Sequence, residues 1–453
     1  MGRGARGLRQ EVALLTGVCT ALHFLVDGLC ICCIYLLADS SPVANLLGVF
    51  ITYNVLAFLT QPLTGMLADR LRPEGMLLAA AIALLAIGVA VAFPLGSTDD
   101  VLPLYIVAVL LGLGNSLFHV WGGRLVTVST GNDIRALGVF VSTGAFGLAV
   151  GMLFHSRLVL VAFLLAIAAL AFYALRLTSK ESKGQESLKE SQVLDSELNK
   201  KPVSMILWLA VLALMGIVML RSLLGETFSA GIAKGGMMIL AIGAVAMIGK
   251  IAGGFLFHWM GIVWAMLLVV AGIVACLLLP STETVLFIGL LLVNCTMAVT
   301  LYLVNAVLPG REGLAFGLLA AALMPGYLLA QADAGGMMIE PLLLTLIPTI
   351  VIELIVLWAL RERRGEVLGS SVVVNILTNV PLHLFVVFVS NSLPAIIVGE
   401  VLVVLVEMLW YRYFVDSWRK AFIYSFLCNG FSLLAGLLLQ CAILLLLILN
   451  PNT

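Results

Sequence analysis

The sequence predicts an all-α integral membrane protein with many helical spans. Hydrophobic residues make up 62% of the 453 residues and charged residues only 11%, whereas a soluble domain carries about 25% charged residues. Apolar runs recur from Glu11 to Asn450, and each is long enough, at roughly 18 residues or more, to cross the hydrocarbon core as a helix. A soluble fold of this length could not bury so much apolar side chain.

The apolar runs predict twelve spans followed by three more. Their approximate bounds are 12–37, 44–67, 76–95, 101–128, 136–155, 158–177, 203–222, 236–257, 260–279, 283–307, 313–332, 341–360, 369–390, 394–412 and 422–449. Cytoplasmic loops collect Lys and Arg. With a cytoplasmic N-terminus, all 24 basic residues except Arg157, Arg221 and Lys234 fall at cytoplasmic loops or helix ends. We therefore expect an external C-terminus and a location in the cytoplasmic (plasma) membrane.

A polar segment separates the first six spans from the next six. It reads TSKESKGQESLKESQVLDSELNKK and is rich in Ser, Lys and Glu, which is typical of a flexible linker or a loosely held surface helix. GMLADRLR begins at Gly65 and GFLFHWMG at Gly254, and this faint repeat indicates two related halves, as in many secondary transporters. The predicted domains are a six-helix bundle at 1–177, a linker at 178–202, a second six-helix bundle at 203–363 and a three-helix segment at 364–453.

Composition also limits the partners and cofactors. The eight cysteines all lie in apolar segments and show no zinc-ligand spacing, so we expect no disulfide, no metal and no cofactor. The 24 basic and 24 acidic residues balance, and we expect no nucleic-acid partner. The sequence shows no nucleophile triad and no phosphate-binding glycine loop, so we do not expect an enzyme.

The first span carries two ionisable residues near its middle, in LHFLVDG. His23 and Asp27 are four residues apart and therefore project from one helix face. An ionised carboxylate at this depth costs roughly 2.5–3.5 kcal/mol and needs a partner or a cavity. We interpret the two residues as a proton-coupling site. The alternative is a hydrogen-bonded pair that only fixes this helix against its neighbours.

The fourth span contains GLGNSLFHVWGGR, residues 112–124. Asn115 and His119 share a face near mid-membrane, and Arg124 lies further toward the cytoplasm. These donors suit a polar or anionic substrate, with Arg124 as a guanidinium clamp. The alternative is a snorkelling arginine and a histidine that bonds to a neighbouring helix.

Several of these motifs occur together in one known family. The His and Asp of LHFLVDG, Gln61-Pro62 before GMLADR, the GxGxxxFH pattern followed by Arg124, and the glycine-rich STGAFGLAVG resemble the fosmidomycin-resistance efflux subfamily of the major facilitator superfamily. The likeness extends over residues 12–175 in motifs and over 203–360 in layout. It implies a fold of two six-helix bundles, here followed by three additional helices, and an alternating-access transporter.

The resemblance also implies a gate at the loop after the second span. There Gly65, Asp69 and Arg70 form a tight cytoplasmic turn, and Asp69 is expected to dock on the N-terminus of an opposing helix, where the dipole favours negative charge. The matching position of the second half holds His258 instead of an acid. A plain solvated turn is the alternative.

Polar residues also occur within other predicted spans. Pro325-Gly326 breaks span eleven, as broken helices do at transporter binding sites, while Glu353 in span twelve has no assigned role. The additional candidates for substrate binding are Asn54, Gln61, Asn294, Tyr302 and Asn305. Packing between helices explains such residues equally well.

The last three spans carry a polar hairpin. Asn375, Asn379 and His383 share one face of span thirteen, while Glu400 and Glu407 share a face of span fourteen. Carboxylates facing lipid are costly, so we expect Glu400 opposite His383 and Glu407 opposite Asn375 and Asn379. The expected role is structural or regulatory attachment, with a separate ion path as the alternative.

Together these features predict a secondary active transporter of a small polar or anionic organic solute or drug. We expect proton-coupled efflux by a monomer in the lipid bilayer. The alternative is a membrane sensor or scaffold that kept the fold but does not transport.

Overall fold

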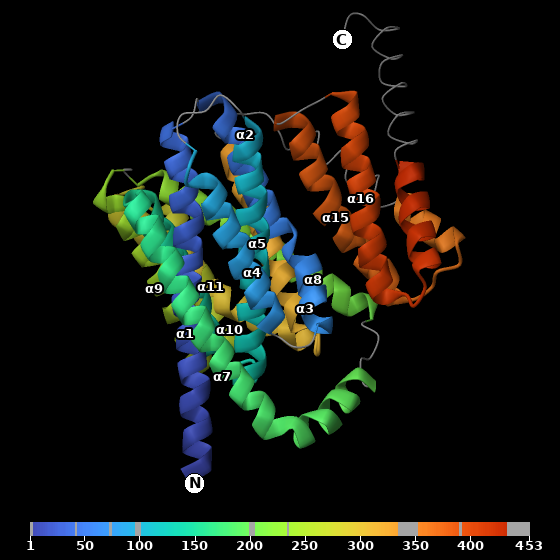
Figure 1. Cartoon of the computed structure of the whole chain (residues 1–453), viewed down its shortest axis with the longest axis horizontal. Helices are drawn as coiled ribbons and strands as arrows, with labels where there is room; N and C mark the ends of the chain where they lie inside the picture. Colours follow the sequence, from blue (N-terminus) through green and yellow to red (C-terminus); the bar gives the residue numbers. More distant parts are fainter. Residues whose placement is uncertain are drawn as a thin grey trace, which may run out of the picture. The chain divides into compact units, whose positions relative to one another are not determined.

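A computed structural model describes residues 3–40, 43–71, 75–95, 101–198, 204–232, 235–333, 352–388 and 392–432. The described elements are helical throughout, with no strand among them (Figure 1). The helices of the first half are α1 (Arg3–Ser40), α2 (Val43–Asn54), the π-helical η1 (Val55–Leu59), α3 (Gln61–Arg70), α4 (Gly75–Ala92), α5 (Val101–Thr130), α6 (Ile134–Leu153) and α7 (Arg157–Leu198).

The second half and the C-terminal region follow the same pattern. Their helices are α8 (Met205–Ala230), α9 (Met237–Met260), α10 (Ile262–Leu278), α11 (Glu283–Val307), α12 (Glu312–Ala321), α13 (Leu323–Asp333), α15 (Gly365–Phe388) and α16 (Leu393–Phe414). Residues 352–359 and 418–432 are also helical. Among the described helices, ten are long and apolar enough to cross a membrane. The all-α, multi-span fold class predicted from the sequence is confirmed.

Three predicted segments differ in detail. The second span is divided into α2, η1 and α3, because Pro62 lies in the first turn of α3, has no N–H to donate and crowds the preceding turn. Helix α7 continues through most of the polar segment after residue 178. Of the two alternatives for this segment, the helix therefore agrees with the structure and the flexible linker does not. Most of the predicted spans 341–360 and 422–449 lie outside the described residues.

The described residues form two compact units, Met1–Lys200 with Leu214–Ala330 and Lys201–Ala213 with Gln331–Thr453. We call them the transporter unit and the C-terminal unit. Inside the transporter unit, α1 packs against α6, α6 against α9, and α3 against α12. The last two contacts join the first six-helix half to the second. The four-part division expected from the sequence stays a prediction.

Burial separates the interior of each unit from its surface. In the transporter unit the interior includes Phe118 and Phe140, whereas Leu158, in the apolar stretch Arg157–Thr178 of α7, and Leu278 of α10 are about four-fifths exposed. Such apolar outer faces suit a lipid environment, where no hydrophobic force drives them inward. In the C-terminal unit, Trp208 packs edge-on against Phe414 at 5.6 Å.

Candidate functional site

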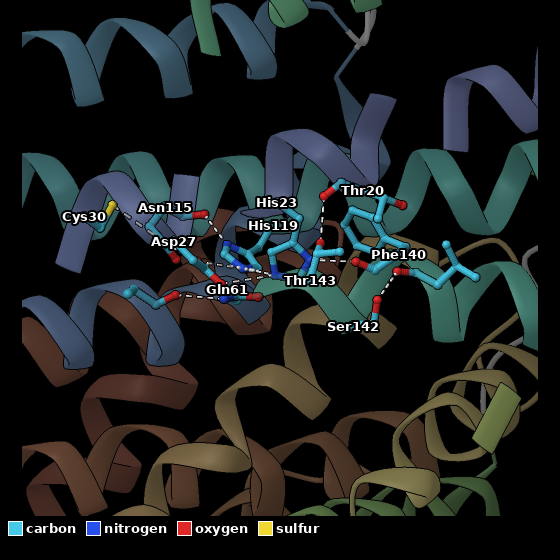
Figure 2. A network of polar contacts seen from close by, with 12 residues as sticks. Thr20, His23, Asp27, Cys30, Gln61, Asn115, His119, Phe140, Ser142 and Thr143 are labelled. Atoms are coloured by element: carbon cyan, nitrogen blue, oxygen red, sulfur yellow. Dashed lines mark hydrogen bonds and ion pairs between the residues drawn. The ribbon is translucent and has the colours of Figure 1, made fainter. Parts of the chain in front are cut away.

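Three ionisable side chains meet inside the first half of the transporter unit (Figure 2). His23 and Asp27 lie one turn apart on α1, His119 lies on α5, and none is more than 8% exposed. Asp27 Oδ2 lies 3.3 Å from His23 Nε2, and Asp27 Oδ1 lies 3.4 Å from His119 Nε2. The structure thus brings together the candidates of spans one and four, and we call these three residues the His–Asp–His centre.

Backbone carbonyls fix the tautomer of both histidines. His23 Nδ1 lies 2.8 Å from the carbonyl oxygen of Phe140, and His119 Nδ1 lies 2.9 Å from that of Asn115. Because a carbonyl only accepts, both Nδ1 atoms must carry a proton. The two Nε2 atoms lie 2.9 Å apart, so a hydrogen bond between them needs one additional proton. The pair therefore holds one shared positive charge beside the Asp27 carboxylate.

The same three residues place one ligand atom each within 4.8 Å of one another, as a metal site would. Two imidazole nitrogens bound to one tetrahedral zinc ion, at 2.0–2.1 Å each, would lie about 3.3 Å apart. The observed separation of 2.9 Å is shorter and matches a hydrogen bond. A proton therefore fits the centre better than a metal ion.

Two neighbours hold the centre in place. The Asn115 amide donates to Asp27 Oδ1 at 3.0 Å, so the carboxylate keeps a fixed donor besides the histidines. On α6, a side chain at Gly144 would overlap Asp27 Oδ2 and come within 2.5 Å of His23 Nε2. The glycine-rich span therefore allows α6 to cover the centre closely.

A second charged contact joins the two halves at the predicted gate. The Asp69 carboxylate accepts the backbone N–H of Gly313 at 2.8 Å and that of Leu314 at 2.9 Å, both in the first turn of α12. Arg124 Nε lies 3.3 Å from Asp69 Oδ1, and Gly65 packs directly on Gly313. Asp69 thus lies on a helix N-terminus, as the motif implied. Arg124 thus contacts the acid of this dock, and its expected role as a substrate clamp stays a prediction.

The related contact of the second half is built differently. Gly254 packs on the first turn of α6, as Gly65 does on α12, so the repeat has a structural counterpart. At this contact of the second half, the acidic residue is Asp133, which is the N-cap residue of α6. The exposed His258 of α9 interacts with Asp133 electrostatically. Hydrogen bonds from Arg135 hold the pKa of Asp133 below its ordinary value, although partial burial opposes them.

Sequence reasoning missed two cations of the second half. Arg221 is 7% exposed inside α8, and Lys250 lies on α9. Lys250 interacts electrostatically with Asp27 and His119 of the His–Asp–His centre, and also with Arg221. Arg221 had been placed outside the membrane because span seven was expected to end near residue 222, whereas α8 continues to Ala230.

Comparison with protein families agrees with this architecture. Residues 18–330 match the family model described as Major Facilitator Superfamily. The chain belongs to the major facilitator superfamily. It is thus a secondary transporter that moves a solute across a lipid bilayer, in a superfamily that is in general not enzymatic. A search of curated proteins found no match.

The other predicted substrate-site residues of the transporter lie in separate places. The Asn54 and Asn294 amides each donate to a carbonyl of their own helix, and the Gln61 amide donates to the Ala57 carbonyl of η1. Tyr302 and Asn305 contact Asn132 in the α5–α6 turn, through the Tyr302 carbonyl oxygen and the Asn305 amide. None of these hydrogen bonds reaches the His–Asp–His centre. Arg70 is exposed at the end of α3.

The polar hairpin of the C-terminal unit has other partners than expected. Glu407 of α16 faces α15 through Thr378, which donates to its Oε1 at 3.0 Å, rather than through Asn375 or Asn379. Asn429 and Ser425, from residues 418–432, donate to its Oε2. The predicted pairing of Glu407 with the two asparagines is wrong, because Thr378, Ser425 and Asn429 donate to its two carboxylate oxygens instead.

Asn375 and Asn379 form hydrogen bonds with other residues of the C-terminal unit. Asn375 donates to Glu353 Oε2 at 2.6 Å, and Asn379 donates to Asn375. Glu353, which had no assigned role, is thus a member of this buried polar cluster. Glu400 is half-buried, and the expected partner side chain of His383 lies outside the described residues.

Proposed function

We propose that this transporter couples the movement of a small polar or anionic organic solute to protons. The observation that carries the proposal is the 2.9 Å separation of His23 Nε2 and His119 Nε2 beside the Asp27 carboxylate, which is the distance of a hydrogen bond and so favours a shared proton. A proton can pass between these three side chains with only small displacements, because all the relevant atoms lie within 3.4 Å of a neighbour. Ionisable residues at this depth are characteristic of proton relays in transporters.

The centre can couple the proton to conformational change through α6. Phe140, whose carbonyl fixes His23, and Gly144, which covers Asp27, lie one turn apart on α6. The opposite side of α6 packs against α9 of the second half. Removing the shared proton leaves two nitrogen lone pairs facing each other at 2.9 Å, which favours separation of α1 from α5 and a shift of the covering helix. Protonation thereby biases one of two arrangements.

The Asp69 dock supports alternating access. Its carboxylate holds the α12 N-terminus against α3, and Arg124 adds a cation. We propose that this contact closes the cytoplasmic side in one state and breaks in the other. The alternative of a transport-inactive sensor is not favoured, because both the proton centre and the dock are built completely.

Direction and topology follow from the sequence motifs and the charge pattern. The motifs of the fosmidomycin-resistance subfamily support efflux, in which inward protons drive the solute outward. The distribution of Lys and Arg supports a cytoplasmic N-terminus, an external C-terminus and a plasma-membrane location. We further propose that the protein works as a monomer, with the three additional C-terminal helices as a structural attachment.

Flux measurements test the proposal. Purified protein is screened by thermal shift against metabolites and antibiotics, and each stabilising compound is followed in proteoliposomes with an imposed pH gradient. We expect accumulation of at least one compound that disappears when the gradient is collapsed with an ionophore. Facilitated flux that ignores the pH gradient would contradict proton coupling, and binding without any flux would favour the sensor.

A further inference from the structure

Arg221 is a buried guanidinium without a matching acid. Its Nη1 contacts the Met297 sulfur on α11, and its Nη2 has no hydrogen-bond partner. Among the described residues, no acidic side chain acts on it electrostatically. Glu226, the next acid along α8, acts on Tyr327 instead. A guanidinium carries five N–H donors and normally has acceptors when it is removed from water. The Arg221 guanidinium therefore has fewer hydrogen-bond acceptors in the protein alone than a buried guanidinium needs.

Lys250 is the second cation of this region, and it interacts electrostatically with Arg221, Asp27 and His119. Its backbone carbonyl packs against Gly138, half a turn before Phe140, whose own carbonyl fixes His23. The Lys250 charge acts on Arg221 and on Asp27, and Asp27 is the one acid that acts on it within the described part of the chain. Lys250 thus faces the first half of the transporter from α9.

Helix α11 places a third group at this location. Asn294 lies against Gly249, the neighbour of Lys250, and Met297 lies one turn further along and contacts Arg221. Residues from α8, α9 and α11 therefore converge at one location in the second half. Because the Lys250 carbonyl packs against Gly138 of α6, this location adjoins the first half, and a solute held there could contact both halves.

The charge balance of this region favours an anion. The His–Asp–His centre is neutral when it holds its shared proton, since one imidazolium offsets the Asp27 carboxylate. No described acid acts on Arg221, and Asp27, the one described acid that acts on Lys250, is already offset by the shared imidazolium, so the two cations leave an excess of positive charge. Charges inside a membrane protein are costly unless they are paired, so the two cations are expected to gain a partner during the transport cycle.

We propose that Arg221 and Lys250 bind the acidic group of the transported solute. The ligand class is a small organic anion whose oxyanion group accepts parallel N–H bonds from the planar Arg221 guanidinium and a point charge from Lys250. This inference rests on the proposed transport function and adds the charge of the substrate and the residues that recognise it. Asn294 contacts the neutral part of the solute.

Binding without a pH gradient tests the proposal. The probes are benzylphosphonate, neutral benzyl alcohol and cationic benzylamine, applied to full-length protein in nanodiscs with binding measured by intrinsic fluorescence. Only the anion is expected to bind. Arg221→Gln and Lys250→Met should each weaken its binding by about 10- to 100-fold, the usual worth of a charged hydrogen bond. Arg221→Lys should keep part of the affinity, and the exposed Arg157→Gln, the matched control, should keep all of it.

The thermal stability of the ligand-free protein provides a second readout. Removing an unpaired buried charge should raise the melting temperature, so Arg221→Gln and Lys250→Met are both expected to be more stable than wild type without ligand. Equal binding of the three probes, no binding of the anion by wild type, or unchanged anion affinity in both variants would overturn the proposal. A lower melting temperature in both variants would identify the two cations as structural and would also overturn it.

The outcome is separable from that of the proposed function. Anion binding is measured without a gradient, so it can succeed even if proton coupling fails. Conversely, gradient-driven flux of a neutral solute would sustain the transport function and reject the anion site.

Discussion

Two buried acidic regions in this chain differ in the chemistry of their partners. In the transporter unit, the Asp27 carboxylate contacts two imidazoles that share one proton. In the C-terminal unit, the Glu407 carboxylate accepts hydrogen bonds from Thr378, Ser425 and Asn429, and Glu353 accepts one from Asn375. Both acidic regions are almost completely buried.

The difference separates a site that can change charge from one that only holds helices together. Imidazole gains and loses a proton near neutral pH, whereas hydroxyl and amide donors keep theirs throughout the physiological range. Moreover, Lys250 of the second half acts on the Asp27 region, while Glu353 and Glu407 contact no basic residue in the described part of their unit. We therefore propose that coupling belongs to the transporter unit and that the glutamate cluster is structural.

The largest expected effect is on proton coupling. His119→Gln removes the shared proton while leaving a side chain of similar length. Gradient-driven accumulation of the solute should fall by about 100-fold, near the upper end of a typical coupling free energy. His155→Gln is the matched control, because His155 also contacts an acid, Asp39, at 2.8 Å, but that acid is largely exposed. Equal losses in the two variants would erase the proposed difference between buried and exposed pairs.

Asp69 should show an intermediate effect. Its partners are a guanidinium, which keeps its proton at any physiological pH, and two backbone N–H groups. Asp69→Asn weakens the dock by about 1.5–3 kcal/mol, the range for charged hydrogen bonds, so the closed state should become about 10- to 100-fold less populated. Cysteine labelling near the α12 N-terminus measures this opening. The transport rate should change, but its pH profile should keep its shape, and a shifted profile would assign Asp69 to the proton path.

The smallest effect on transport is expected in the C-terminal unit. Glu407→Ala removes the acceptor of three buried donors on two helices, Thr378, Ser425 and Asn429, which costs about 1–3 kcal/mol of stability. Glu407→Gln keeps one acceptor oxygen and should lie between this variant and wild type in melting temperature. Initial transport rates per folded molecule should be unchanged in both. A loss of pH dependence in Glu407→Gln would show that the cluster takes part in coupling and would break the comparison.

The features of the site that depend on spacing along one helix could be predicted from the sequence. His23 with Asp27 and Asn115 with His119 are each four residues apart, so their shared faces followed from helix geometry. The link between α1 and α5 does not follow from spacing along either helix, and the structure supplies it as contacts of Asp27 with Asn115 and of His23 with His119. The Asp69 dock came from the motif and not from its residues alone.

The features that were missed depend on contacts between helices. Arg124 looked available because nothing in its own span shows that Asp69 reaches it. Arg221 was expected on the external side because span seven was predicted to end near residue 222, although the helix continues to Ala230. Depth along the hairpin correctly brought Glu407 to face α15, but the rotation of each helix, which selects Thr378 over Asn375, is set by packing with other helices.

The central claim is that Asp27 and its two histidines carry the coupling proton, and one measurement tests it most directly. Asp27→Asn keeps the size of the side chain and its contact with Asn115 but removes the charge that balances the shared proton. Solute exchange across proteoliposomes with equal pH on both sides is compared with accumulation driven by a pH gradient. The account predicts that exchange persists while gradient-driven accumulation is lost. Accumulation at the wild-type level with an unchanged pH dependence would contradict it.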